Sequence, residues 1–160
     1  VGGRRYRRRG GRVKKDQFDK LRDLPGKKIV GSVIFSKKQA TRPLLHAEGI
    51  DIKNDLGVPL RMNININPET GGRCINVVHV GEGAICRLDV DGTEHQDKGR
   101  SHKHDVQDDN SVRRNLKDGV TTRPEMSGKP LRGVFDTFCQ QANITFEGEF
   151  DARDSGGNND

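Results

Sequence analysis

The feature that most restricts the fold is residues 60–67, which read LRMNININ. Every even position from 60 to 66 is apolar and every odd position is polar, which is the alternation of a strand with one buried face and one wet face. Two more strands are predicted at 74–80 (CINVVHV) and 84–90 (AICRLDV), each preceded by turn-forming residues. Short strands joined by tight turns predict an antiparallel β-meander.

The strongest helix pattern covers residues 130–143. Its apolar side chains recur at the spacing of one helical face: Leu131, Val134, Phe135, Phe138, Cys139 and Ala142. Pro130 suits the first turn of a helix, and Asn143 suits its C-terminal end. Because such a face has to be buried, we expect it to cover the apolar face of the meander. The predicted fold class is α+β, an antiparallel β-meander packed against a C-terminal amphipathic helix.

Weaker patterns surround this centre. We predict a short helix at 16–24, a strand at 28–35, a further strand within 44–52 and a final edge strand at 144–150. Residues 105–119 carry scattered helix signals, and residues 120–129 are predicted to be a loop.

The basic charge of the chain is concentrated at its N-terminus. Of 29 Lys and Arg residues, eight lie in residues 1–15, which hold no acid, and the other 21 are matched by 23 Asp and Glu. A chain of 160 residues is of single-domain length. We predict a flexible, disordered Arg-rich arm at 1–15, one α+β domain at 16–150 and a polar disordered tail at 151–160. The arm suits phosphate backbones, and a solvated tail without a ligand is the alternative.

Cysteine use and hydropathy bear on the compartment. Cys74, Cys86 and Cys139 are an odd number without Cys-x-x-Cys spacing, which predicts buried thiols in a reducing compartment. No stretch approaches the ~20 apolar residues of a membrane span, and no apolar signal segment follows the basic N-terminus. We expect a cytoplasmic protein with no membrane partner.

Potential ligands and proton carriers are densest in residues 87–109 (RLDVDGTEHQDKGRSHKHDVQDD). His102 and His104 stand two apart, so on a strand both imidazoles face the same side and can meet one metal ion or one phosphate. A third metal ligand would come from one of three residues: His95, Asp89 or Asp108. The competing interpretation is a pair of exposed polar histidines in a loop.

Chemistry without a metal is the second possibility, and it is the one we adopt. Histidine transfers protons near neutral pH, and arginine stabilises charge that develops on a phosphate. Cleaving RNA through its own 2′-hydroxyl needs only a base, an acid and a cation. The segment supplies these side-chain types in Arg87, Lys98, Arg100, His102, Lys103 and His104. We predict no bound metal and no cofactor.

Three motifs in residues 60–146 resemble a group of small prokaryotic and phage proteins. They are a hairpin that ends in Arg87-x-Asp89, the segment GRSHKH at 99–104, and the helix motif F-x-x-F-C-x-x-x-N-I at 135–144. The layout is similar to that of TumE-type toxins of toxin–antitoxin modules, which are related to RelE/ParE-like folds. The resemblance implies an RNA-directed toxin with a small antitoxin-like partner, and it places four residues in the catalytic positions: Arg87, Asp89, His102 and His104.

These observations lead to two hypotheses of function. The first is a nucleic-acid-acting protein of a mobile-element or toxin–antitoxin type, with a metal-independent RNA-cleaving site. The second is a non-catalytic nucleic-acid-binding protein of phage or mobile-element origin, which uses the Arg-rich arm and the Arg/Asn face of the meander. Both predict RNA or DNA as the partner. The predicted nucleic-acid contacts are Arg4, Arg5, Arg7, Arg8, Arg9, Arg12, Arg61, Lys98, Arg100 and Lys103.

Overall fold

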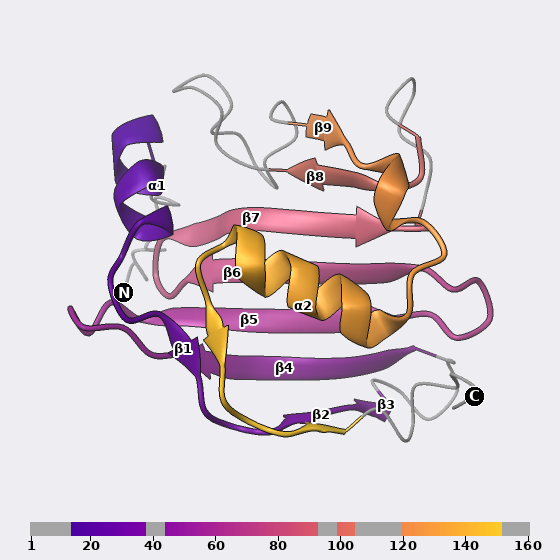
Figure 1. Cartoon of the computed structure of the whole chain (residues 1–160), viewed down its shortest axis with the longest axis horizontal. Coiled ribbons are helices and arrows are strands. Elements are labelled where there is room, and N and C mark those ends of the chain that lie inside the picture. Colours follow the sequence, from indigo (N-terminus) through magenta and orange to yellow (C-terminus); the bar gives the residue numbers. More distant parts are fainter. Residues whose placement is uncertain (1–13, 38–43, 93–98, 105–119, 152–160) are drawn as a thin grey trace, which may run out of the picture.

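The computed structural model describes residues 14–37, 44–92, 99–104 and 120–151. Its main sheet has seven strands in chain order, and every neighbouring pair is antiparallel (Figure 1). The strands are β3 (Ser36–Lys37), β4 (Leu45–Ile52), β5 (Leu60–Ile66), β6 (Arg73–His79), β7 (Gly83–Val90), β8 (His102–His104) and β9 (Val120–Thr122). The predicted meander is confirmed, and it continues on both sides of the three strands that the sequence marks most clearly.

In β5 the apolar residues alternate with polar ones, and the apolar residues are the buried ones. Its four apolar side chains are at most 4% exposed: Leu60, Met62, Ile64 and Ile66. The same face continues across the sheet, where Ile64 of β5, Ile75 of β6 and Leu88 of β7 are successive register partners. Side chains opposite one another on one face of a sheet pack together, so a continuous apolar surface results.

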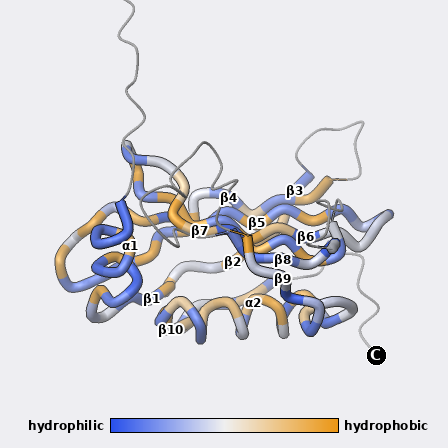
Figure 2. The backbone as a smooth tube through the Cα atoms, turned by 90° about the horizontal axis from the view of Figure 1, so that it is seen from above, coloured by the Kyte–Doolittle hydropathy of each residue, from blue (hydrophilic) through white to orange (hydrophobic). Residues whose placement is uncertain are grey.

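Helix α2 (Leu131–Gln141) covers this apolar surface (Figure 2). Its buried side chains are Val134, Phe135, Phe138 and Cys139. Phe135 is fully buried, and burying a side chain of that kind contributes roughly 1.5–3 kcal/mol to stability. Asn143 has a φ of 57°, the left-handed conformation that commonly ends a helix. The opposite face of the main sheet carries none of the described helices.

The predicted strand at 28–35 and the predicted edge strand at 144–150 are not part of the main sheet. Each is divided into two short strands, giving β1 (Lys28–Ile29), β2 (Val33–Ile34), β10 (Thr145–Phe146) and β11 (Phe150–Asp151). β1 pairs in parallel with β10, and β2 pairs in parallel with β11. At the break between the pairs, a Cβ on Gly148 would overlap the carbonyl oxygen of Gly31. The predicted final strand is therefore confirmed in part: the structure has strands within these residues, but they are interrupted and pair with β1 and β2 outside the main sheet.

Other boundaries also differ from the prediction. Helix α1 (Lys15–Arg22) has Lys14 as its N-cap, so the last two residues of the predicted arm belong to the described fold. The predicted loop at 120–129 contains β9, whose residues are β-branched, and the short 3-10 helix η3 (Pro124–Met126). Asp151, the first residue of the predicted tail, ends β11. The remainder of the arm and tail, and the helix signals at 105–119, lie outside the described residues.

The three cysteines are free thiols. Cys86 and Cys139 are buried as predicted, and Cys74 is half-buried. Burial raises the pKa of Cys74 and of Cys139 to about 12, so neither is a thiolate near neutral pH. Among the described helices, none has the length and apolarity that a membrane crossing requires.

Candidate functional site

The pairing of β7 with β8 brings together the four residues predicted to be catalytic. Arg87 is the register partner of His104, and Asp89 is the register partner of His102. Strand residues two positions apart share a face, so all four side chains lie on one face of the main sheet. It is the face opposite α2, because the intervening Leu88 belongs to the core beneath the helix.

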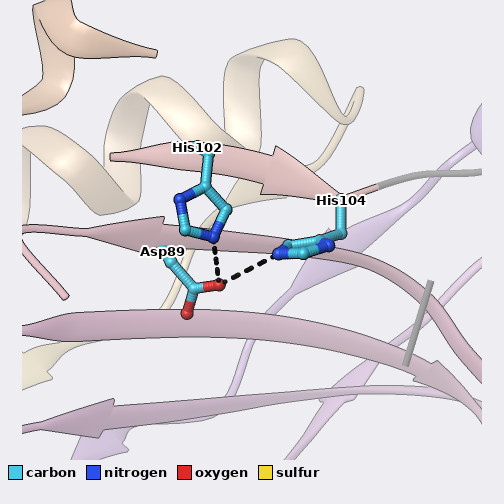
Figure 3. Close-up of side chains that lie close together, drawn as sticks. All are labelled: Asp89, His102 and His104. Carbon is cyan, nitrogen blue, oxygen red and sulfur yellow. Dashed lines mark ion pairs between the residues drawn. The ribbon is translucent and has the colours of Figure 1, made fainter. Parts of the chain in front are cut away.

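One carboxylate oxygen, Oδ2 of Asp89, is the centre of the cluster. Arg87 donates to it through Nε at 2.9 Å and lies 2.8 Å from it through Nη2. The Nε2 atoms of His102 and His104 lie 3.3 Å and 3.4 Å from the same oxygen (Figure 3). The two imidazole rings meet edge to face with their centroids 4.8 Å apart. A cation and two imidazoles thus share one anionic atom, which orients all three groups.

His102 is held from its other side by the backbone. Its Nδ1 lies 3.2 Å from the carbonyl oxygen of Gly99, and a carbonyl only accepts, so Nδ1 carries a hydrogen. Gly99 has a φ of 71°, a conformation that favours glycine, and the turn there presents its carbonyl to the ring. His102 Nε2 therefore faces Asp89 either as the N–H of an imidazolium or as a lone pair beside a shared cation.

Exposure falls steadily across the cluster. The side chain of Arg87 is 28% exposed and that of Asp89 is 15% exposed, whereas His104 is 6% and His102 is 1% exposed. A molecule that approaches this face of the sheet therefore meets Arg87 first and His102 last. Burial raises the pKa of Asp89, but its contacts with His104, Arg87 and Cys74 outweigh that effect and lower the pKa to about 2. Asp89 is thus a carboxylate throughout the physiological pH range.

A polar groove of about 450 Å³ opens beside the cluster, at one end of β5, β6 and β7. Its walls include Asn65, Arg73, Cys74, Asp89, Asp91 and Arg100. Asn65, Cys74 and Asp89 are successive register partners, so the groove reaches the cluster across neighbouring strands. Amide and guanidinium groups of this kind bind phosphates and base edges in nucleic-acid complexes.

Asp91, which is not among the site residues predicted from the sequence, anchors this end of the sheet. Its carboxylate accepts hydrogen bonds from Arg73 Nη2 at 3.1 Å, from the Gly128 amide at 2.9 Å and from the Ser127 hydroxyl. Its own amide donates to Ser101 Oγ at 3.1 Å, directly before β8. Asp91 therefore fixes where β8 begins relative to β7. Its φ of 52° is in the left-handed region, which aspartate tolerates better than most residues.

The residues predicted to contact nucleic acid do not all lie on one surface of the structure. Arg61 is exposed on the same face as the cluster, on β5, and Arg100 lines the polar groove while donating to the carbonyls of Asp91 and Gly92. Lys103 alternates with the two histidines and lines a separate cavity on the α1 side, so it does not share their face. The other predicted contacts lie outside the described residues: Arg4, Arg5, Arg7, Arg8, Arg9, Arg12 and Lys98.

The three candidate ligand atoms fit a metal ion. One atom each from Asp89, His102 and His104 lies within 4.8 Å of the others, and the donor set of two imidazoles and a carboxylate suits a transition metal. Of the third ligands considered from the sequence, Asp89 occupies that place, whereas His95 and Asp108 are outside the described residues. Arg87 already supplies a cation to the same oxygen. The charge of Asp89 is therefore already paired with that of Arg87. The same carboxylate and the two histidines also form a possible set of metal ligands.

Comparison of the chain with protein-family models, with curated proteins and with solved structures gives no match. The resemblance to TumE-type toxins stays a prediction. Function therefore has to be inferred from the geometry of the cluster and from the groove beside it.

Proposed function

We propose that this protein acts on nucleic acid, and that it cleaves RNA without a metal at the cluster of Arg87, Asp89, His102 and His104. The convergence of a guanidinium and two imidazoles on one carboxylate oxygen, next to a polar groove, supports this proposal. Groups that are held before the substrate arrives stabilise developing charge without reorganisation, which is how enzyme sites accelerate phosphoryl reactions.

The exposure of each side chain suggests its role. Arg87, the most exposed, binds the phosphate and stabilises the charge that develops on it. His104 accepts the proton of the RNA 2′-hydroxyl as that oxygen attacks phosphorus, and a water molecule donates a proton to the 5′-oxygen that departs on the opposite side. Asp89 holds Arg87 and His104 in place. His102 is the least exposed of the four side chains, so we assign it the role of a positioning residue that orients Asp89.

The products of this reaction are a 2′,3′-cyclic phosphate and a 5′-hydroxyl end. A single-stranded RNA oligonucleotide should be cleaved in excess EDTA, whereas the same strand with 2′-deoxy sugars should remain intact. His104→Ala and Arg87→Met should each lower the cleavage rate by about 100-fold or more. His79→Ala, on β6 away from the cluster, is the matched control. Equal cleavage by wild type and His104→Ala would sink the proposal.

The resemblance to TumE-type toxins suggests the role of RNA cleavage in the cell. On that basis the protein is a toxin of a mobile element, and a small antitoxin-like protein is its expected partner. Expression in a bacterial host should then arrest growth, and His104→Ala should relieve the arrest. Growth arrest of equal strength by His104→Ala would separate any toxicity from the cluster.

A second candidate is a non-catalytic nucleic-acid-binding protein. The face of the main sheet opposite α2 supports this candidate. Arg61 is exposed on that face, and Arg100 and Asn65 both line the groove beside the cluster. Phosphate contacts of this kind give affinity without turnover. The two candidates differ in whether RNA is shortened when it is bound, so the cleavage assay above also discriminates between them.

A further inference from the structure

We propose that Asp89, His102 and His104 form a binding site for a divalent transition-metal ion such as Zn²⁺, and that the ion replaces Arg87 as the cation on Asp89. The metal site stands on geometry alone and does not depend on what the protein does to RNA. Its consequence for cleavage rests on the proposed function.

Two of the three distances between the ligand atoms are those of a metal site. Zinc binds imidazole nitrogen and carboxylate oxygen at about 2.0–2.2 Å, so two such ligands at a tetrahedral angle lie about 3.4 Å apart. The Nε2 atoms of His102 and His104 lie 3.3 Å and 3.4 Å from Asp89 Oδ2. All three ligand atoms lie within 4.8 Å of one another, so rotations of the two imidazole side chains suffice to bring them onto one ion.

The backbone contact of His102 points the same way. Metal-binding histidines commonly donate their second ring N–H to a carbonyl or carboxylate, which fixes the tautomer and turns the other nitrogen toward the metal. His102 does this through Nδ1 and Gly99, so in its neutral form Nε2 presents a lone pair to Asp89. In that form the lone pairs of Nε2 and Oδ2, atoms 3.3 Å apart, face each other, and a metal ion bound to both atoms replaces their repulsion by two bonds.

Arg87 marks the place of that cation. Its Nη2 lies 2.8 Å from Asp89 Oδ2 and 3.5 Å from His104 Nε2, which are two of the three proposed ligand atoms. A divalent ion brings more charge to the same position and bonds all three ligands at once. With 28% of its side chain exposed, Arg87 can move into solvent when the ion binds.

Metal binding is measured on EDTA-stripped, dialysed full-length protein, by calorimetric titration with ZnCl₂ and by the shift in melting temperature. We expect one strong site per chain. His102→Gln and His104→Ala should weaken it at least about tenfold, because each removes a ligand. Arg87→Met should bind zinc more tightly than wild type, because it removes the competing cation. His79→Ala should leave the affinity unchanged.

The opposite directions of these effects keep the test sharp. A variant that merely unfolds loses binding, so tighter binding by Arg87→Met cannot come from damage to the fold. No zinc binding above that of the His104→Ala variant, or weaker binding by Arg87→Met, would overturn the metal site.

The consequence for activity is read separately. Zinc occupies the His104 nitrogen that the proposed cleavage uses, so zinc should inhibit RNA cleavage by the stripped protein, and EDTA should restore it. Zinc binding without any cleavage would leave the metal site standing and contradict the proposed function. Cleavage without zinc binding would support the proposed function and contradict the metal site. Stimulation by zinc would overturn the inhibitory role.

Discussion

Lys27 carries a buried amine, 6% exposed, whose three hydrogen-bond acceptors are all backbone carbonyls. Two belong to the last turn of α1, at Leu21 and Arg22, and the third belongs to Ala142 at the C-terminal end of α2. The last carbonyls of a helix have no partner within the helix, and they carry the negative end of its dipole. One side chain therefore completes the ends of two helices that lie more than one hundred residues apart in the chain.

The buried amine makes stability depend on pH. Burial lowers the pKa of Lys27 from 10.5 to about 8, so between these values the unfolded chain binds more protons than the folded one, and stability rises with pH. The free energy of unfolding of wild type should therefore increase relative to Lys27→Met by about 1–2 kcal/mol between about pH 7.5 and pH 10. Denaturant titration at both pH values measures this difference. The exposed neighbour Lys28→Met is the control, and a constant difference between wild type and Lys27→Met would contradict the assignment.

The residues of the candidate site could be predicted from the sequence, whereas the contacts between them could not. Asp89, His102 and His104 are already evident as candidates in the sequence, because potential ligands with strand spacing stand out locally. That one oxygen of Asp89 contacts Arg87 and both histidines depends on the register between β7 and β8, which hydrogen bonds across the strands determine. Lys103 was predicted to join them, yet strand alternation turns it to the other face.

Two short parallel pairs, β1 with β10 and β2 with β11, tie the N-terminal part of the chain to the segment after α2. The hydrogen bonds run through the break between the pairs, from the amide of Glu147 to the carbonyl of Ile29 and from the amide of Val33 to the carbonyl of Glu149. The two backbones approach closely at Gly31 and Gly148. Glycine is needed at position 148, because a side chain there would push the two segments apart.

The two glycines make a matched pair of substitutions. A Cβ on Gly148 would overlap the Gly31 carbonyl oxygen, whereas a Cβ on Gly31 meets nothing within 4 Å. Gly148→Ala should therefore lower the free energy of unfolding by about 1–3 kcal/mol. Gly31→Ala should leave it unchanged or raise it slightly, because alanine restricts the unfolded chain. Urea unfolding of the two variants measures both effects, and equal stabilities would show that the parallel pairs contribute little.

Charge divides the molecule into a basic N-terminus and a balanced remainder. Residues 1–13 contain six arginines and no acid, and without them the chain has 23 Lys and Arg against 23 Asp and Glu. Because α1 begins at Lys15 with Lys14 as its N-cap, a deletion of residues 1–13 removes none of the described residues. Any long-range attraction to a polyanion is therefore expected to come from the arm.

The deletion tests this expectation. Binding of full-length protein to single-stranded RNA should weaken with salt, and each phosphate neutralised contributes about 0.7 to the slope of log affinity against log salt concentration. Removing residues 1–13 should lower that slope by up to about 4, if all six arginines contact phosphates. Fluorescence anisotropy over a range of salt concentrations provides the slopes. An unchanged slope would remove the arm from the binding surface and assign the phosphate contacts to basic residues of the described fold, such as Arg61, Arg87 and Arg100.

The sequence alone determined the elements whose signal is local. Alternation with a period of two sets the buried face of β5, and the apolar stripe with a period near 3.6 sets α2, because each depends only on which neighbours share a face. These two features were enough to predict a meander covered by a helix. The dense group of potential ligands at 87–109 and the two-residue spacing of its histidines placed Arg87, Asp89, His102 and His104 among the candidates.

Tertiary structure decided the rest, because it concerns residues that meet across long stretches of chain. The parallel pairing of β1 with β10, the three carbonyls around Lys27 and the anchoring of β8 by Asp91 each need two or more segments to be positioned at once. No local pattern encodes such a meeting, since either segment alone reads as an ordinary strand, turn or charged residue. The segment around His102 and His104 is the clearest case. Its residues were visible in the sequence, but only the pairing of β8 with β7 makes them a site.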